Sequence, residues 1–108
     1  MGKYRDKISL MVPNNLRYLP LVLNSTADFA RILGFDDKQI KEVILGVEEA
    51  VVNVIDHAFA EGEQASFELI FQEIALGMQV LIKDQGMPFD PVELAKIAKR
   101  KTFGTEDT

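Results

Sequence analysis

The chain has 108 residues, 47% of them hydrophobic, which fits one compact domain with a modest core. Its 12 Lys and Arg against 17 Asp and Glu give a formal net charge of -5, so it lacks the basic excess that proteins use to hold a nucleic-acid backbone. There are no cysteines and no apolar run as long as a membrane span, so we expect a cytoplasmic protein without disulfides, thiolate metal sites or membrane contact.

The first third of the chain predicts a strand followed by a helix. Residues 8–12 are mostly apolar and are followed by a proline, which is typical of a strand followed by a break. Asn14 and Asn15 come next and offer the side chains that favour turns and helix caps. Apolar residues at helical spacing then predict a helix that begins near Leu19, with a proline in its first turn, and stops at Gly34.

A second, longer helix is predicted over residues 37–59. Asp36, with Gln39 three residues on, indicates a capping box, in which each side chain bonds the backbone N–H of the other residue. From Ile40 to Ala58, apolar residues recur at steps of three and four, as on the buried face of an amphipathic helix. This is the strongest periodic signal in the chain.

The rest of the chain predicts a β-hairpin and then a short helix. Apolar residues alternate from Phe67 to Phe71 and again from Met78 to Ile82, on either side of a short turn that contains glycine. Residues 92–99 predict a short helix that opens at Pro91. This element order favours an α+β fold, a two-layer sandwich with the helices on one face of a mostly antiparallel sheet.

The long predicted helix also carries a line of polar residues. Glu49 and Asn53 are one turn apart, Asp56 lies near the same line, and His57 lies beside it. Taken alone, such a line is typical of a solvated helix face. However, residues 43–58 contain no Lys, Arg or Gln, so we expect the line to lie inside the protein as one wall of a site. A carboxylate there can act as a general base, and an amide oxygen one turn away can bind Mg²⁺.

A second candidate feature follows the second strand of the predicted hairpin, in the segment DQGMPFDP. Asp84 begins this segment, and Gly86 lies two residues on. A carboxylate at that place can accept a hydrogen bond from the amino group of a flat base, and a glycine lets the ring approach the backbone. Taken alone, the segment is typical of an acidic turn after a strand.

Together, these two features resemble a known family of ATPase domains. Glu49-x-x-x-Asn53 on a long helix, a hairpin, and then Asp84-x-Gly86 are similar to the Bergerat fold of gyrase-type ATPases, Hsp90 chaperones, sensor histidine kinases and mismatch-repair ATPases. Within that superfamily, EEAVVNVIDHA and DQGMPFDP most resemble the small bacterial anti-sigma-factor serine kinases. The residues that match the helix pattern of these kinases are Glu49, Ala50, Val51, Asn53, His57 and Ala58.

The resemblance implies an ATP-dependent serine kinase that regulates transcription. Such a kinase binds a sigma factor and phosphorylates an anti-anti-sigma antagonist, with ATP and Mg²⁺ as cofactors and a homodimer as one assembly. Direct contact with nucleic acid is not expected. Two alternatives stay open: a non-catalytic regulatory binding module of the same fold, and the ATP-binding domain of a sensor histidine kinase.

The resemblance also implies a role for each matching residue. Glu49 lies where the family has its general base, and Asn53 where the family binds the Mg²⁺ that bridges the ATP phosphates. Asp84 lies where an aspartate accepts the adenine amino group.

Three further residues complete the implied nucleotide pocket. Gly86 lies where the family has a glycine beside the base. Asp56 and His57 would line the same pocket. We do not expect His57 to bind a metal, since the chain has no second histidine to share that role.

The match weakens toward the C-terminus. Pro88 stands where much of the superfamily has a second glycine, and proline offers no backbone N–H. Gly104 is the only glycine after Gly86, so no phosphate-binding glycine loop can be assembled from the residues that remain. We therefore expect residues 1–108 to be a single ATPase-like domain that lacks the C-terminal lid and the second glycine motif. We interpret it as a piece of a longer protein. The alternatives are that the other half of the domain is missing from this sequence, or that the domain has lost catalysis.

Overall fold

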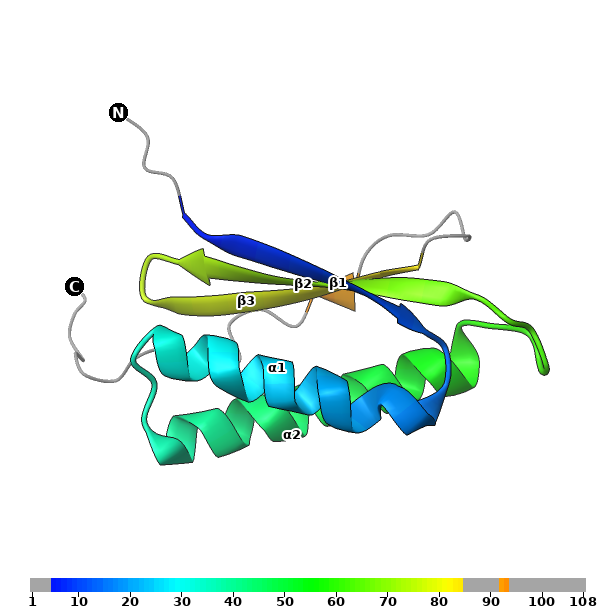
Figure 1. The fold of residues 1–108 in the computed structure, drawn as a ribbon, viewed down its shortest axis with the longest axis horizontal. Helices are drawn as coiled ribbons and strands as arrows, with labels where there is room; N and C mark the ends of the chain where they lie inside the picture. The colour runs from blue at the N-terminus through cyan, green and yellow to red at the C-terminus, as the bar shows by residue number, and fades with distance from the viewer. Residues whose placement is uncertain (1–4, 85–91, 94–108) are drawn as a thin grey trace.

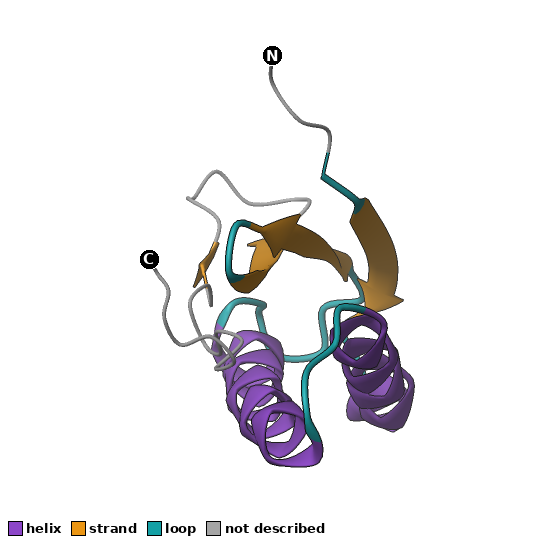
Figure 2. Ribbon diagram, turned by 90° about the vertical axis from the view of Figure 1, so that its left-hand side faces the viewer, coloured by secondary structure: helices purple, strands orange, loops and turns teal. Residues whose placement is uncertain are grey.

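The computed structural model describes residues 5–84 and 92–93 and shows two helices packed on one face of an antiparallel sheet (Figures 1 and 2). The predicted two-layer α+β sandwich is therefore confirmed. In chain order, the elements are β1 (Lys7–Pro13), the short 3₁₀ helix η1 (Leu16–Tyr18), α1 (Leu19–Ile32), α2 (Asp37–His57), β2 (Ser66–Ile74), β3 (Gly77–Asp84) and β4 (Val92–Glu93).

The sheet has the strand order β1-β2-β3-β4, and every neighbouring pair is antiparallel. β2 and β3 form the predicted hairpin, with Ile74 opposite Gly77 at its turn. β1 comes first in the chain but pairs with β2, which lies beyond both helices. One row across the sheet joins Val12 of β1, Phe67 of β2 and Asp84 at the end of β3.

The core lies between the sheet and the two helices. Because side chains alternate along a strand, every second residue of β2 and β3 points toward the helices. Phe29 of α1 stacks on Phe71 of β2, with ring centroids 5.8 Å apart. Each large apolar side chain buried in this way stabilises the fold by roughly 1.5–3 kcal/mol. The strand residues that are almost fully buried are Phe67, Leu69, Phe71, Met78, Val80 and Ile82.

The helix ends follow the predicted chemistry. In the capping box of α2, the N–H of Gln39 donates to Asp36 Oδ1 at 2.8 Å, and the N–H of Asp36 donates to Gln39 Oε1 at 2.9 Å. α1 ends in a Schellman motif, in which the N–H of Phe35 donates to the carbonyl of Ala30 at 3.1 Å. Gly34 has a φ of 92° there, a conformation that suits glycine.

The prediction of a helix that begins at Val92 is wrong. Val92–Glu93 form β4, which pairs with β3 and places Val92 opposite Ile82. Pairing with β3 satisfies backbone groups of both strands, and valine is well suited to a strand, so the tertiary partner overrides the local helix signal. The rest of that predicted helix lies outside the described residues.

Within residues 5–84 and 92–93, no helix is both long enough and apolar enough to cross a membrane.

Candidate functional site

The polar line on α2 lies on the helix face opposite the core. α2 buries one stripe of side chains, which includes Val43, Val47 and Val51. In the part of the chain that the structure describes, the side chains on the polar line are instead exposed, so the expectation that they lie inside the protein is wrong there. The reason is geometric, since α1 and the sheet cover only one side of α2 (Figure 2). The exposed residues are Glu49, Asn53, Asp56 and His57.

Glu49 and Asn53 line the same hollow. Its volume is about 530 Å³, and Leu45, Glu48 and Val52 complete its lining. Neither Glu49 nor Asn53 makes a hydrogen bond or ion pair with another described residue, so no group in residues 5–84 or 92–93 occupies the carboxylate or the amide. The hollow therefore combines an available proton acceptor with an available oxygen ligand.

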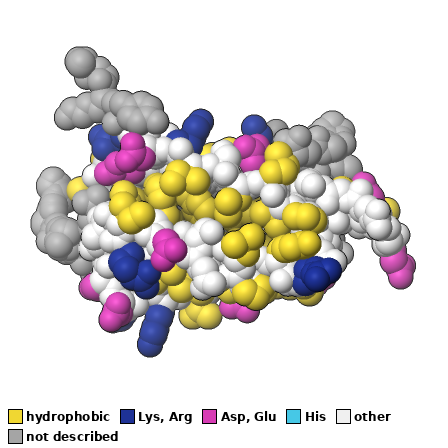
Figure 3. All heavy atoms as spheres, viewed as in Figure 1, with side chains coloured by type: hydrophobic (Ala, Val, Ile, Leu, Met, Phe, Trp, Pro, Cys, Tyr) yellow, Lys and Arg dark blue, Asp and Glu magenta, His cyan; other side chains and the backbone are white. Residues whose placement is uncertain are grey.

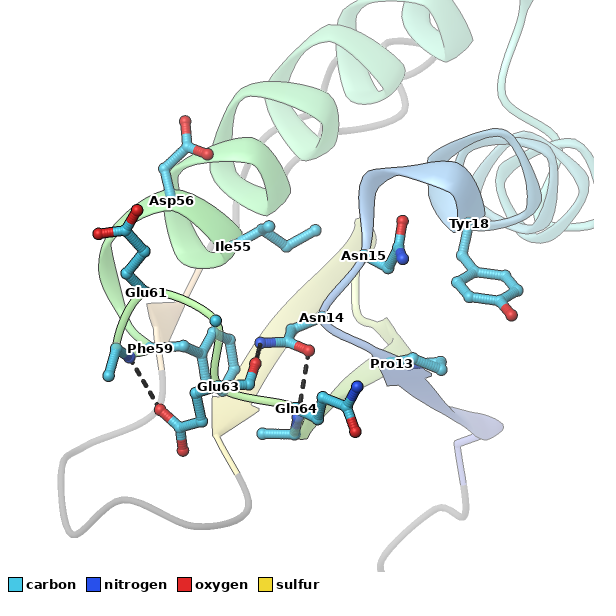
Figure 4. Close-up of a pocket in the computed structure, with 13 residues that line it drawn as sticks. Pro13, Asn14, Asn15, Tyr18, Ile55, Asp56, Phe59, Glu61, Glu63 and Gln64 are labelled. Carbon is cyan, nitrogen blue, oxygen red and sulfur yellow. Dashed lines mark hydrogen bonds between the residues drawn. The ribbon is translucent and has the colours of Figure 1, made fainter.

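Asp56 lines a different hollow, at the C-terminal end of α2 (Figure 4). This hollow measures about 740 Å³ and lies between the turn after β1 and the loop that joins α2 to β2. Tyr18 and Phe59 contribute aromatic side chains to its lining. Asp56 thus lines a different hollow from Glu49 and Asn53, and His57 lines neither of the two.

Asp84 is the last residue of β3, and its backbone is paired with that of Phe67. The ring of Phe67 lies 6.5 Å, centroid to centroid, from the ring of Phe59, which follows α2 by two residues. The end of β3 is therefore connected to the end of α2 through one buried aromatic residue. Gly86 and Pro88 lie outside the described residues.

A third hollow lies between α1 and β1 and is mostly apolar. It measures about 190 Å³ and includes Ile8, Phe29 and Ile32 in its lining. Figure 3 shows hydrophobic side chains gathered over the middle of this face. Ile32 is 76% exposed and Leu21 56% exposed. Because Asp28 is the only carboxylate among its described lining residues, this hollow suits apolar contact better than catalysis.

A magnesium ion would fit the free amide of Asn53. Among the residues that the structure describes, no three His, Cys, Asp or Glu side chains come together as a ready-made metal site. Mg²⁺ commonly binds through one or two protein oxygens, with phosphate and water as its other ligands. An exposed amide in a hollow therefore suits a metal that arrives with a nucleotide.

The sequence predicts only part of the structural role of the Asn14–Asn15 pair. Asn14 and Asn15 were predicted to favour turn or cap chemistry, and Asn15 caps η1 by accepting a hydrogen bond from the N–H of Arg17 at 2.9 Å. Asn14 instead contacts the loop that joins α2 to β2, about 50 residues further along the chain. No local pattern in the sequence indicated that contact.

The chain belongs to the family of histidine kinase-like ATPase domains. The model of that family matches residues 12–107. The resemblance to Bergerat-type ATPases is therefore confirmed.

The particular relatives are serine-protein kinases named RsbW. The protein of Halalkalibacterium halodurans is 31% identical over 85 residues, which cover 79% of this chain and 51% of the relative. That of Listeria innocua is 29% identical over 90 residues, covering 83% and 57%, and that of Bacillus thuringiensis is 24% identical over 85 residues, covering 79% and 52%. The chain thus spans about half the length of the curated relatives it matches.

Proposed function

We propose that the chain is the nucleotide-binding part of an ATP-dependent protein serine kinase of the anti-sigma-factor type. The kinase would bind a sigma factor in the cytoplasm and phosphorylate an anti-anti-sigma antagonist, which makes it a regulator of transcription. The observation that carries the proposal is the hollow on α2, where Glu49 and Asn53 lie one turn apart without partners among the described residues. The names of the relatives support the choice of a serine as the acceptor.

Glu49 is the proposed general base. As the serine oxygen of the antagonist forms a bond to the γ-phosphorus of ATP, the bond from that phosphorus to the β–γ bridging oxygen breaks and ADP leaves. The serine proton passes to the Glu49 carboxylate. An exposed carboxylate is suited to this step, and among the described residues no cation pairs with Glu49 and competes for its lone pairs.

Asn53 is the proposed protein ligand for Mg²⁺. Its amide oxygen is a hard donor of the kind that this ion prefers. When bound, the metal would offset the negative charge of the phosphates. Asn53 itself would hold the phosphates one turn along α2 from the base, at a fixed helical spacing.

The remaining proposed contacts belong to the adenine side of the site. Asp84 would accept a hydrogen bond from the adenine amino group, and Gly86 would let the ring approach the backbone. Asp56 and His57, exposed at the C-terminal end of α2, would lie beside the bound nucleotide.

The first test is nucleotide binding by the chain, followed as a change in its melting temperature. A non-hydrolysable ATP analogue with Mg²⁺, at about 100 times its Kd, should stabilise the native state by about 2.7 kcal/mol. For a domain of this size, that gain raises the Tm by roughly 10 °C or more. The absence of any shift in a full-length version of the protein would rule out the kinase proposal.

Two variants divide the proposed roles. Asn53→Ala should remove the part of the Tm shift that depends on Mg²⁺. Glu49→Ala should keep the shift and abolish phosphoryl transfer to a serine substrate. Glu42→Ala, an exposed glutamate two turns earlier on α2, is the matched control and should change neither. Retained turnover in Glu49→Ala would refute the base assignment.

A non-catalytic regulatory module is the second candidate function. The apolar hollow between α1 and β1, with the exposed Ile8 and Ile32 at its sides, favours a protein partner such as a second copy of the chain. In that case, the partner would bind equally well with and without nucleotide.

A further inference from the structure

Asn14 ties together two segments that are far apart in the sequence. Its side-chain Nδ2 donates to the carbonyl of Glu63 at 2.9 Å, and its Oδ1 accepts from the N–H of Ala65 at 3.1 Å (Figure 4). Its own backbone N–H also donates to the carbonyl of Ala65 at 2.9 Å. A side-chain amide can donate and accept at once, from two different atoms, and asparagine carries the shorter of the two amide side chains. The residue therefore fixes the loop at two neighbouring points.

The fixed loop leads directly into the row of strand residues that ends at Asp84. Ala65 precedes Ser66, the first residue of β2, and Phe67 comes next. Phe67 is paired with Val12 on one side and with Asp84 on the other. Phe67 is fully buried and closely packed, so it cannot move independently of its neighbours. A change in the path of the loop should therefore shift Phe67 and, with it, the backbone of Asp84.

The same loop also reaches the end of α2. Phe59 lies at the start of the loop, and its ring contacts that of Phe67. Within the loop, the N–H of Ala60 donates to Glu63 Oε1 at 2.8 Å, and the N–H of Glu63 donates to the carbonyl of Ala60 at 3.0 Å. The two ends of the loop are thus connected, and Asn14 holds the end nearer β2.

We propose that Asn14 is a positioning residue for the nucleotide site. It acts through Ala65 and Phe67 on the backbone position of Asp84, and does not touch the nucleotide. This inference rests on the proposed function, in which Asp84 accepts the adenine amino group. Its specific consequence is that Asn14 governs the choice of base, because adenine presents an amino donor where guanine presents a carbonyl acceptor.

The test compares the affinities for ATP and for GTP, with Mg²⁺, in the chain and its variants. Calorimetric titrations are run at a temperature at which circular dichroism shows every variant folded. Asn14→Ala should weaken ATP binding about tenfold and GTP binding much less. A small displacement of Asp84 weakens the hydrogen bond to the adenine amino group, and guanine does not make that bond. Asn14→Asp keeps the acceptor for the N–H of Ala65 and should give an intermediate loss.

Asp36→Ala is the matched control. It removes the capping box at the opposite end of α2, and so lowers stability without touching the start of β2. Its ratio of ATP to GTP affinity should equal that of the unaltered chain. A merely structural role for Asn14 predicts similar ratios in both alanine variants.

The outcomes separate the two proposals. An unchanged affinity ratio in folded Asn14→Ala, or an equal fall in Asp36→Ala, overturns the positioning role alone. Should Asn14→Ala fail to fold, the ratio in Asn14→Asp decides in its place. If a full-length version without substitutions binds neither nucleotide, the proposed function fails, and the inference drawn from it fails as well.

Discussion

The two faces of α2 differ in what they contribute. One face buries Val43, Val47 and Val51, each no more than 1% exposed, against the sheet and α1. The other face presents Glu49 and Asn53 to solvent, on the same turns of the same helix. The buried side chains hold the helix against the sheet, whereas the exposed side chains can be substituted with little effect on that packing. Substitutions on the two faces should therefore affect stability and ligand binding separately.

The largest effect should come from a charge placed on the buried face. Val47→Asp buries a carboxylate without a partner and should destabilise the fold by about 4 kcal/mol or more, as measured by urea unfolding. Leu45→Asp makes a similar change on the exposed face, where Leu45 is 65% exposed. It should change the free energy of unfolding by less than about 1 kcal/mol. Equal losses in the two variants would mean that the two faces are not distinct.

A smaller effect should follow from removing two methyl groups from the buried face. Val51 is 1% exposed, so Val51→Ala should cost about 2 kcal/mol, from lost burial and the cavity that remains. Val52, its neighbour in the sequence, is only half-buried. Val52→Ala should cost less than about 1 kcal/mol in the same denaturation experiment. The reverse order would show that the helix is rotated about its axis.

The end of α2 should respond more weakly than its buried face. Asp36→Ala removes the acceptor for the N–H of Gln39 and should lower the free energy of unfolding by about 1 kcal/mol. Asp37→Ala, in the first turn, removes only a favourable charge near the helix N-terminus and should cost about 0.5 kcal/mol or less. Thermal melts of both variants measure the difference. A larger loss in Asp37→Ala would contradict the capping box.

The smallest change in stability should come from the exposed face. Glu49→Gln removes a carboxylate that has no described partner, so the free energy of unfolding should stay within about 0.5 kcal/mol. Phosphoryl transfer should nevertheless fall by at least about 100-fold, the usual contribution of a general base. Urea unfolding and a single-turnover transfer assay measure the two quantities. A large loss of stability would show that Glu49 has a structural role.

Sequence patterns predicted those elements whose stabilising interactions join residues close together in the chain. The steps of three and four from Ile40 to Ala58 predicted α2, although the helix ends at His57 and not at residue 59. The pair of Asp36 and Gln39 predicted a cap whose two hydrogen bonds are present. In each case, the interacting groups lie within a few residues of one another, so the sequence contains the whole interaction.

The features that escaped prediction depend on distant partners. β4 has two residues, too few for any periodic signal, and it forms because β3 offers an edge to pair with. The exposure of Glu49 depends on which elements cover α2, and not on the helix itself. The contact from Asn14 to Ala65 spans 51 residues. Features of this kind can be predicted only when the three-dimensional arrangement of the distant segments is known.

The pairing of β1 with β2 has a consequence for how the molecule is made. Ile8 lies opposite Phe71, so both helices and their connections separate the two paired residues. During synthesis, the N-terminal strand leaves the ribosome well before its hydrogen-bonding partner exists. The helices and the β2–β3 hairpin can form from nearby residues, whereas β1 must wait for a long loop to close. Until then, an apolar residue such as Val12, which is only 3% exposed in the folded protein, stays in contact with water.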